Sequence, residues 1–107
     1  MKVYVAGPMT GYPMLNFLAF FRAERDLASQ GYSVINPAKN LGGNTAVECL
    51  DAHIENPMKW EDYLRIDIAT LLDCDAIYLL RGSHNSRGAK LERLIAEGLG
   101  MTVMVEK

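Results

Sequence analysis

The chain has 107 residues, of which half are apolar and 22% charged, and its formal net charge is -2. This length fits one domain, residues 1–107, but is short for a complete enzyme pocket, so we expect pockets shared between subunits. The charge balance excludes a basic surface for a nucleic acid polymer, and no apolar run approaches the roughly 18 residues of a membrane span, so neither is expected as a partner.

The chain opens with a short apolar run at residues 3–6 that stops at Gly7 and Pro8. β-branched and aromatic residues followed by chain breakers predict a buried strand that runs into a turn. In an open α/β sheet, the loop after such a strand is where ligands bind. We therefore expect Gly7, Pro8, Met9 and Gly11 to contact a ligand.

A helix is expected from about residue 17 to residue 30, with Asn16 as its N-cap and Gly31 as its C-terminal stop. Its inward stripe should be Phe17, Phe20, Phe21, Leu27 and Ala28. This stripe is continuous and apolar, so the pattern predicts a purely structural helix.

The remaining elements alternate in type. They are a strand at 32–35, a long segment without pattern at 38–55, a helix opened by Asn56 and Pro57 and ending near Asp73, a strongly apolar strand at 76–80, a helix from about 87 that ends at 98–100, and a strand at 102–105. Alternating strands and helices indicate right-handed βαβ units. We predict an α/β fold: a single Rossmann- or flavodoxin-like three-layer sandwich with a parallel sheet of about four to five strands.

One carboxylate lies in the middle of the apolar stripe of each of two predicted helices. The first stripe is Trp60, Tyr63, Leu64, Asp67 and Leu71, and the second is Gly88, Glu92, Ile95, Ala96 and Leu99. Burying an unpaired carboxylate costs several kcal/mol, so such a pair points to use in chemistry. Paired carboxylates suit glycosidic bonds, with one as nucleophile and the other handling protons. The alternatives are a Glu92 paired with an arginine and an Asp67 hydrogen-bonded to Tyr63 or a backbone amide.

A second candidate feature is the start of the Glu92 helix. If the first strand neighbours the third, the loops that follow both strands open at one edge of the sheet. Ser83, Ser86, Arg87 and Gly88 then offer donors and close approach near a helix N-terminus, which attracts anions. The same residues also fit plain helix capping, and both interpretations stay open.

The possible metal ligands are weaker candidates. Cys49 and His53 lie at helical spacing, but no second His or Cys completes a site there. His84 is interpreted as an exposed loop residue. We therefore predict no metal and no cofactor. Cys49 and Cys74 are expected to be free thiols, which fits the cytoplasm.

Taken together, the motifs resemble a known family. They are Tyr4 to Pro8, Asp67 placed eight residues before Asp75, Ser86-x-Gly88-x-x-x-Glu92, and the run Ala96-Glu97-Gly98-Leu99-Gly100. In this order they resemble the nucleoside 2-deoxyribosyltransferase superfamily, which includes the 2'-deoxynucleoside 5'-monophosphate N-glycosidases. More narrowly, the chain looks like the small DUF4406-type members. It departs from the superfamily pattern at Arg93 and Glu97, where small residues are usual.

The resemblance implies a role for each matching residue. Glu92 matches the nucleophile, Asp67 the acid that assists departure of the base, and Tyr4 the tyrosine that orients the nucleophile. Ser86 and Gly88 match the loop that holds a 5'-phosphate. It also implies homodimers or larger assemblies in which a neighbouring subunit completes each pocket.

We therefore expect an enzyme that cleaves the N-glycosidic bond of a small nucleoside or nucleoside 5'-monophosphate, by hydrolysis or by deoxyribosyl transfer. The competing hypothesis is a module on the same fold that binds or sequesters a nucleotide without cleaving it.

Overall fold

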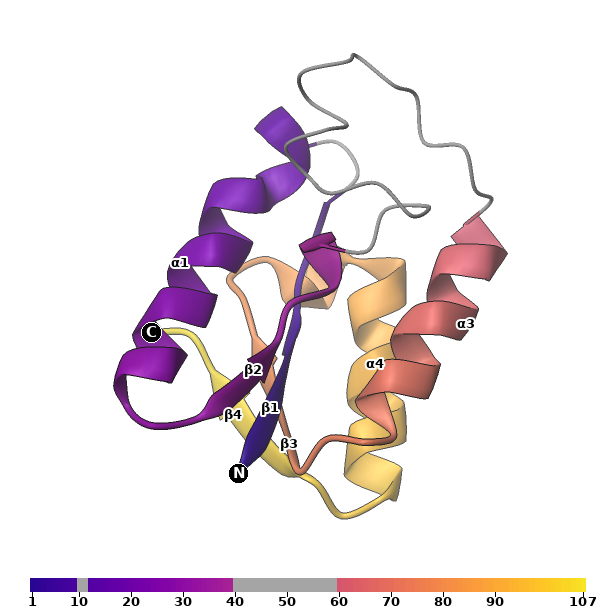
Figure 1. The fold of residues 1–107 in the computed structure, drawn as a ribbon. Coiled ribbons are helices and arrows are strands. Elements are labelled where there is room, and N and C mark those ends of the chain that lie inside the picture. The colour runs from indigo at the N-terminus through magenta and orange to yellow at the C-terminus, as the bar shows by residue number, and fades with distance from the viewer. Residues whose placement is uncertain (10–11, 40–59) are drawn as a thin grey trace.

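The computed structural model describes residues 1–9, 12–39 and 60–107 (Figure 1). Its strands are β1 (Lys2–Ala6), β2 (Ser33–Ile35), β3 (Ala76–Leu79) and β4 (Thr102–Val105), and its helices are α1 (Phe17–Ser29), α3 (Trp60–Leu71) and α4 (Arg87–Gly98). Short 3-10 turns occupy Pro13–Asn16, Pro37–Lys39 and Ser83–Asn85. The predicted alternation of strands and helices is confirmed in these ranges. The proposed cap at Asn56 and Pro57 and the possible ligands Cys49 and His53 lie outside them.

The sheet is entirely parallel, with the strand order β2-β1-β3-β4. The condition set for the candidate site, that the first strand neighbours the third, is met: Ala6 is opposite Leu79, and the Leu80 amide donates to the Ala6 carbonyl at 2.8 Å. The chain leaves β1 toward one edge through β2 and then returns to β3 on the other side of β1. This reversal opens a crevice at the carboxyl ends of β1 and β3.

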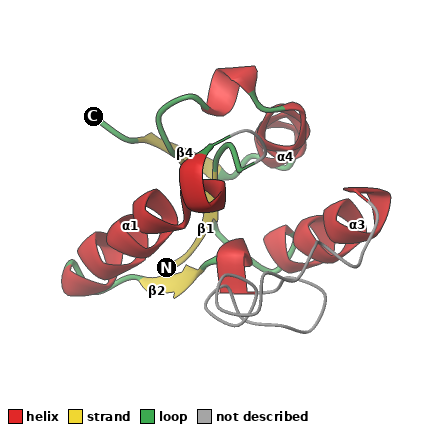
Figure 2. Cartoon of the chain, turned by 90° about the horizontal axis from the view of Figure 1, so that it is seen from above, coloured by secondary structure: helices red, strands yellow, loops and turns green. Residues whose placement is uncertain are grey.

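The helices cover both faces of the sheet, which gives three layers (Figure 2). α1 lies on one face, while α3 and α4 lie side by side on the other (Figures 1 and 2). Along β1 the side chains alternate between these faces: Val3 and Val5 pack toward α1, and Tyr4 and Ala6 pack toward α4. Every residue from Val3 to Ala6 is buried, as expected for an interior parallel strand.

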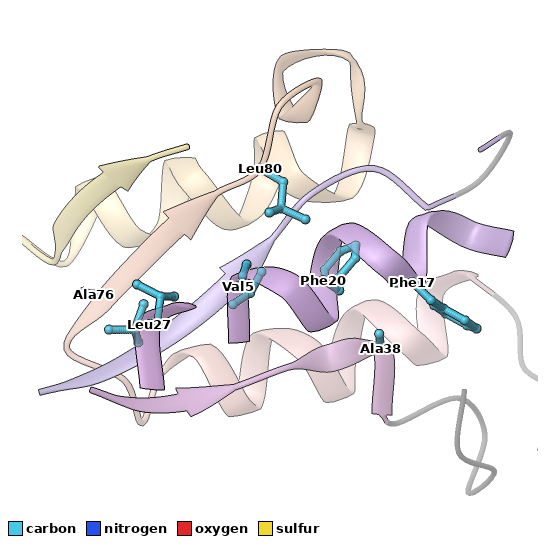
Figure 3. Packing of buried hydrophobic residues seen from close by; sticks show 9 residues of the cluster. Val5, Phe17, Phe20, Leu27, Ala38, Ala76 and Leu80 are labelled. Carbon is cyan, nitrogen blue, oxygen red and sulfur yellow. The ribbon is translucent and has the colours of Figure 1, made fainter. Parts of the chain in front are cut away.

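The core under α1 is aromatic and aliphatic (Figure 3). Phe17, Phe20, Ala23 and Leu27 are the buried residues of α1. The predicted inward position of Ala28 is wrong, because Ala28 is exposed and Ala23 is buried instead. In a helix the stripe through 20, 23 and 27 leaves residue 28 about 100° away from residue 27, on the solvent side.

The predicted stop at Gly31 and the predicted end of the Glu92 helix at residues 98–100 are confirmed. At the end of α1, Gly31 has a φ of 95°, and the amides of Gly31 and Tyr32 donate to the carbonyls of Ala28 and Leu27. Gly100, with a φ of 70°, ends α4 with the same pair of hydrogen bonds. This is the Schellman arrangement, which needs a left-handed residue and so favours glycine. Because Tyr32 belongs to it, β2 begins one residue later than predicted.

The ends of two further elements, and the position of one residue of the predicted inward stripe, differ from the sequence prediction. α3 ends at Leu71 rather than near Asp73, and β3 ends at Leu79 rather than Leu80. Leu99 lies just after α4 and is 56% exposed, so it does not continue the inward stripe. No helix among the described residues is both long and apolar enough to cross a membrane.

Candidate functional site

A cavity of about 280 Å³ opens at the carboxyl ends of β1 and β3. Its walls come from five parts of the chain: the loop after β1, the start of α1, the turn after β2, the middle of α3 and the start of α4. The lining residues are Ala6, Gly7, Pro8, Met9, Tyr12, Leu15, Phe20, Pro37, Tyr63, Leu64, Asp67, Asn85, Ser86, Arg87, Gly88, Ala89 and Glu92. The volume is at the low end for a small-molecule site.

Glu92 reaches this cavity because α4 lies close against the sheet. Its neighbours at three residues before and four after are the buried alanines Ala89 and Ala96, whose small side chains admit a close approach. Glu92 itself is only 6% exposed. A carboxyl at this depth requires a polar partner.

That partner is Tyr4, which comes from the strand beneath. The Tyr4 hydroxyl donates a hydrogen bond to Glu92 Oε2, and the Tyr4 side chain is completely buried. The strand alternation places Tyr4 on the α4 face, so the two residues meet across a separation of 88 positions. The alternative of a Glu92 paired with an arginine is wrong among the described residues.

The neighbouring Arg93 forms an ion pair with Glu97 instead, with Nε and Oε1 2.9 Å apart. Both side chains are half-exposed, so the pair lies on the outer side of α4. The two departures from the superfamily pattern are therefore partners of each other and do not line the cavity.

Asp67 enters the cavity from α3, beside Tyr63 and Leu64. Burial raises the pKa of Asp67 to about 7. The pKa of Glu92 is raised to about 8: burial is the largest cause, the Tyr4 hydrogen bond opposes it, and the nearby Asp67 charge adds to it. Burial and the two carboxylates hold the pKa of Tyr4 well above its ordinary range, so Tyr4 keeps its proton as a donor.

The start of α4 forms another part of the wall. Ser86 is the N-cap, and its Oγ accepts a hydrogen bond from the Ala89 amide at 3.2 Å. Capping is thus confirmed for Ser86. Ser86, Arg87 and Gly88 also line the cavity, at the positive end of the helix dipole. The helix start therefore faces the same space as the two carboxyls.

The cavity brings together most of the predicted site residues. Gly7, Pro8, Met9, Asp67, Ser86, Arg87, Gly88 and Glu92 all line it. Tyr4 does not line the cavity itself but contacts Glu92, which does. Ser83 does not line the cavity either. It begins the 3-10 turn Ser83–Asn85, and its carbonyl oxygen accepts a hydrogen bond from the Ser86 amide. Gly11 is outside the described residues. His84 is exposed and is not part of the wall.

Sequence reasoning missed the apolar part of the wall. Its members are Tyr12, Leu15, Phe20, Pro37, Tyr63 and Leu64. Tyr63 and Leu64 lie on the stripe of Asp67 and could have been included on that ground. The prediction that α1 is purely structural is wrong, since Phe20 belongs to the core and also lines the cavity. No sequence pattern distinguishes a core phenylalanine from one that also borders a pocket.

The family described as Domain of unknown function (DUF4406) matches residues 1–105. No curated protein matches the chain.

Proposed function

This chain belongs to the DUF4406 family, and we propose that it cleaves the N-glycosidic bond of a small nucleoside or nucleoside 5'-monophosphate through a covalent glycosyl-enzyme intermediate. The observation that carries the proposal is one cavity holding two buried carboxyls, one of them hydrogen-bonded by a tyrosine hydroxyl. A carboxylate that is costly to bury and is held in place by one donor suits attack on an oxocarbenium-like centre.

The first step uses one proton and two carboxyls. Ionised Glu92 forms a bond to C1' of the sugar while the bond from C1' to the base nitrogen breaks. The electron pair of that bond goes to the nitrogen, which takes the proton of Asp67. The hydrogen bond from Tyr4 stabilises the ionised form of Glu92. The state that reacts is the one in which Glu92 is ionised and Asp67 carries the proton.

The second step releases the sugar. A water molecule attacks C1', Asp67 accepts the proton of that water, and the bond between C1' and Glu92 breaks to restore the carboxylate. If the base of a second molecule attacks instead of water, the same intermediate gives deoxyribosyl transfer. The ligand is a free nucleoside or nucleotide, and no cofactor enters either step.

The apolar and polar ends of the cavity suggest how such a substrate binds. Tyr12, Tyr63 and Phe20 offer aromatic surface for a base. The α4 N-terminus with Ser86 and Arg87 offers donors and a positive dipole end for a 5'-phosphate. We therefore propose the 5'-monophosphate as the preferred substrate form.

The test measures the release of free base by chromatography. The protein is incubated with nucleosides and with 2'-deoxynucleoside 5'-monophosphates, with and without an acceptor base. Release by the parent and by Glu97→Gln, but not by Glu92→Gln, is the expected result; Glu97→Gln is the matched control because it changes an exposed glutamate of the same helix. Activity of Glu92→Gln at the parent level would refute the nucleophile assignment. If the parent binds a nucleotide and releases no base from any compound, the protein is a binding module instead.

The phosphate preference has its own test. Arg87→Ala should raise KM for a 5'-monophosphate by about tenfold or more, because a hydrogen bond to a charged group contributes about 1.5–3 kcal/mol. KM for the unphosphorylated nucleoside should change little. Arg93→Ala is the control, since Arg93 pairs with Glu97 away from the cavity. An equal effect of Arg87→Ala on both substrates would contradict a phosphate contact.

We further propose that the protein acts as a homodimer in the cytoplasm, and that α3 carries the dimer contact. Leu64, Ile68, Ala69 and Leu72 line a groove on α3, flanked by Glu61 and Arg65. Leu72 is 55% exposed, and Leu64 lines both this groove and the cavity. We infer a second copy of the chain as the partner, because a two-fold axis through the groove would pack the same apolar surface of each copy against the other.

Analytical ultracentrifugation tests this contact. The parent should sediment as a dimer and Leu72→Glu as a monomer. Leu94→Glu, at a position 65% exposed on α4, is the control and should leave the dimer intact. A monomeric parent at micromolar concentration would exclude the dimer.

A further inference from the structure

Three consecutive residues before α1 have left-handed backbone conformations. The φ angles of Met14, Leu15 and Asn16 are 51°, 52° and 62°. For residues other than glycine and asparagine, this conformation costs about 1–2 kcal/mol per residue. A turn of this kind persists only where surrounding contacts hold it.

The helix pattern explains why the chain does not simply extend α1 backward. In a right-handed extension, residue 16 would lie four residues before the buried Phe20, and residue 15 would lie three residues before Leu18, which is 72% exposed. A polar Asn16 would then face the core and an apolar Leu15 would face solvent. The left-handed turn avoids both, and Leu15 instead lines the cavity and packs against the core cluster of α1.

One side-chain hydrogen bond connects this turn to the loop after β1. The Asn16 Nδ2 amide donates to the Pro8 carbonyl oxygen at 2.9 Å. Asn16 occupies the predicted N-cap position of α1, but its side chain makes no capping hydrogen bond to the helix. Asn16 does not line the cavity, whereas Pro8 and the adjoining Met9 do.

Backbone hydrogen bonds extend this connection across the wall. The Leu15 amide donates to the Tyr12 carbonyl at 3.0 Å, and the Tyr12 amide donates to the Met9 carbonyl at 3.1 Å. The Tyr12 hydroxyl lies so close to Gly82 that a Cβ there would be 2.6 Å away. Residues of the loop after β1 and the loop after β3 are thus packed against each other at the cavity.

We propose that Asn16 is a positioning residue that fixes the Pro8, Tyr12 and Leu15 side of the cavity before a ligand arrives. Its amide holds the Pro8 carbonyl and thereby stabilises a left-handed turn that the backbone of Met14 and Leu15 disfavours. A wall that is already ordered reduces the entropy lost on binding. The consequence for ligands rests on the proposed function, whereas the ordering of the wall does not.

The test compares two substitutions that differ in backbone effect. Asn16→Gly keeps the left-handed conformation without strain and removes the amide. Asn16→Asp also tolerates that conformation and replaces the donor with a carboxylate that cannot donate at neutral pH. Ser29→Ala is the control, because it removes another side-chain hydrogen bond to backbone, Ser29 Oγ to the Asp26 carbonyl, at the far end of α1.

The first readout is hydrogen exchange of the Tyr12 and Leu15 amides, which needs no activity. Exchange should be about two- to tenfold faster in both Asn16 variants, as expected for loss of one hydrogen bond, and unchanged in Ser29→Ala. The second readout is binding of deoxyadenosine 5'-monophosphate by calorimetry, where Kd should rise by a similar factor in the two Asn16 variants. In turnover, KM should rise while kcat stays near the parent value, because Glu92 and Asp67 are untouched.

The outcomes separate this proposal from the proposed function. Parent-level exchange in both Asn16 variants overturns the positioning role, even if the parent cleaves nucleotides. Faster exchange in both variants supports it, even if the parent cleaves none. If Asn16→Asp does not fold, the exchange rates of Asn16→Gly decide the question. Glycine adopts the left-handed conformation of residue 16 without strain, so this variant is expected to fold.

Discussion

The hydrogen bond from Tyr4 to Glu92 gives the sharpest test of the site. Tyr4→Phe removes only the hydroxyl and keeps the ring, so the completely buried position of Tyr4 stays filled. Glu92 then has no donor from β1. We expect the pKa of Glu92, which burial already raises to about 8, to rise further, because its ionised form loses the interaction that favoured it.

The size of the effect follows from the charge on the acceptor. A hydrogen bond to an ionised group contributes about 1.5–3 kcal/mol, and each 1.36 kcal/mol is a factor of ten in rate. Tyr4→Phe should therefore lower kcat/KM at neutral pH by about ten- to 150-fold. The acidic limb of the pH profile, where Glu92 must lose its proton, should move to higher pH.

The assay is base release from a 2'-deoxynucleoside 5'-monophosphate between pH 5 and 10. Tyr78→Phe is the control, since Tyr78 is a β3 tyrosine that packs against the α1 core on the opposite face of the sheet. Thermal unfolding of both variants checks that the fold is retained. If Tyr4→Phe keeps the parent kcat/KM and the parent pH profile, the hydrogen bond from Tyr4 does not lower the pKa of Glu92, and the role proposed for Tyr4 is refuted.

Two further predictions concern stability. The pKa of Glu92 is raised from 4.5 to about 8 on folding, so the folded state binds more protons than the unfolded state between these values, and stability falls as pH rises through that range. At pH 8, Glu92→Gln should therefore unfold at a higher temperature than the parent, and its unfolding temperature should depend less on pH. Glu97→Gln should keep the unfolding temperatures of the parent. If the unfolding temperature of Glu92→Gln fell with pH as steeply as that of the parent, the argument would be contradicted. Gly7→Ala should destabilise by about 1–3 kcal/mol in urea, because its Cβ would lie 2.7 Å from the Cβ of Leu80. Gly98→Ala, in α4 with open space around it, should stabilise by about 0.5–1 kcal/mol, and equal effects of the two substitutions would contradict the packing argument.

The local sequence was enough to predict the helices and strands of this fold and to identify the two acids as candidate site residues. The apolar run of β1, the stripe of α4 and the stop at Gly31 each depend on residues within one turn or strand, so the pattern alone places them. The positions of Glu92 and Asp67 on apolar stripes also marked them as candidates before any contact was known. The parallel sheet followed from the general rules for βαβ units, whereas the pairing of β1 with β3 was established by the structure.

Only the tertiary structure decided which residues meet. Tyr4 and Glu92 are 88 positions apart, and their hydrogen bond depends on the side of β1 that faces α4. The same holds for Asn16, whose local pattern predicted a helix cap while its amide in fact donates to Pro8. Phe20 and Leu15 line the same cavity as Ala6 at the end of β1, a placement that no local pattern contains. Element type is thus determined by neighbouring residues along the chain, whereas partners and cavity walls are determined by packing between segments far apart in it.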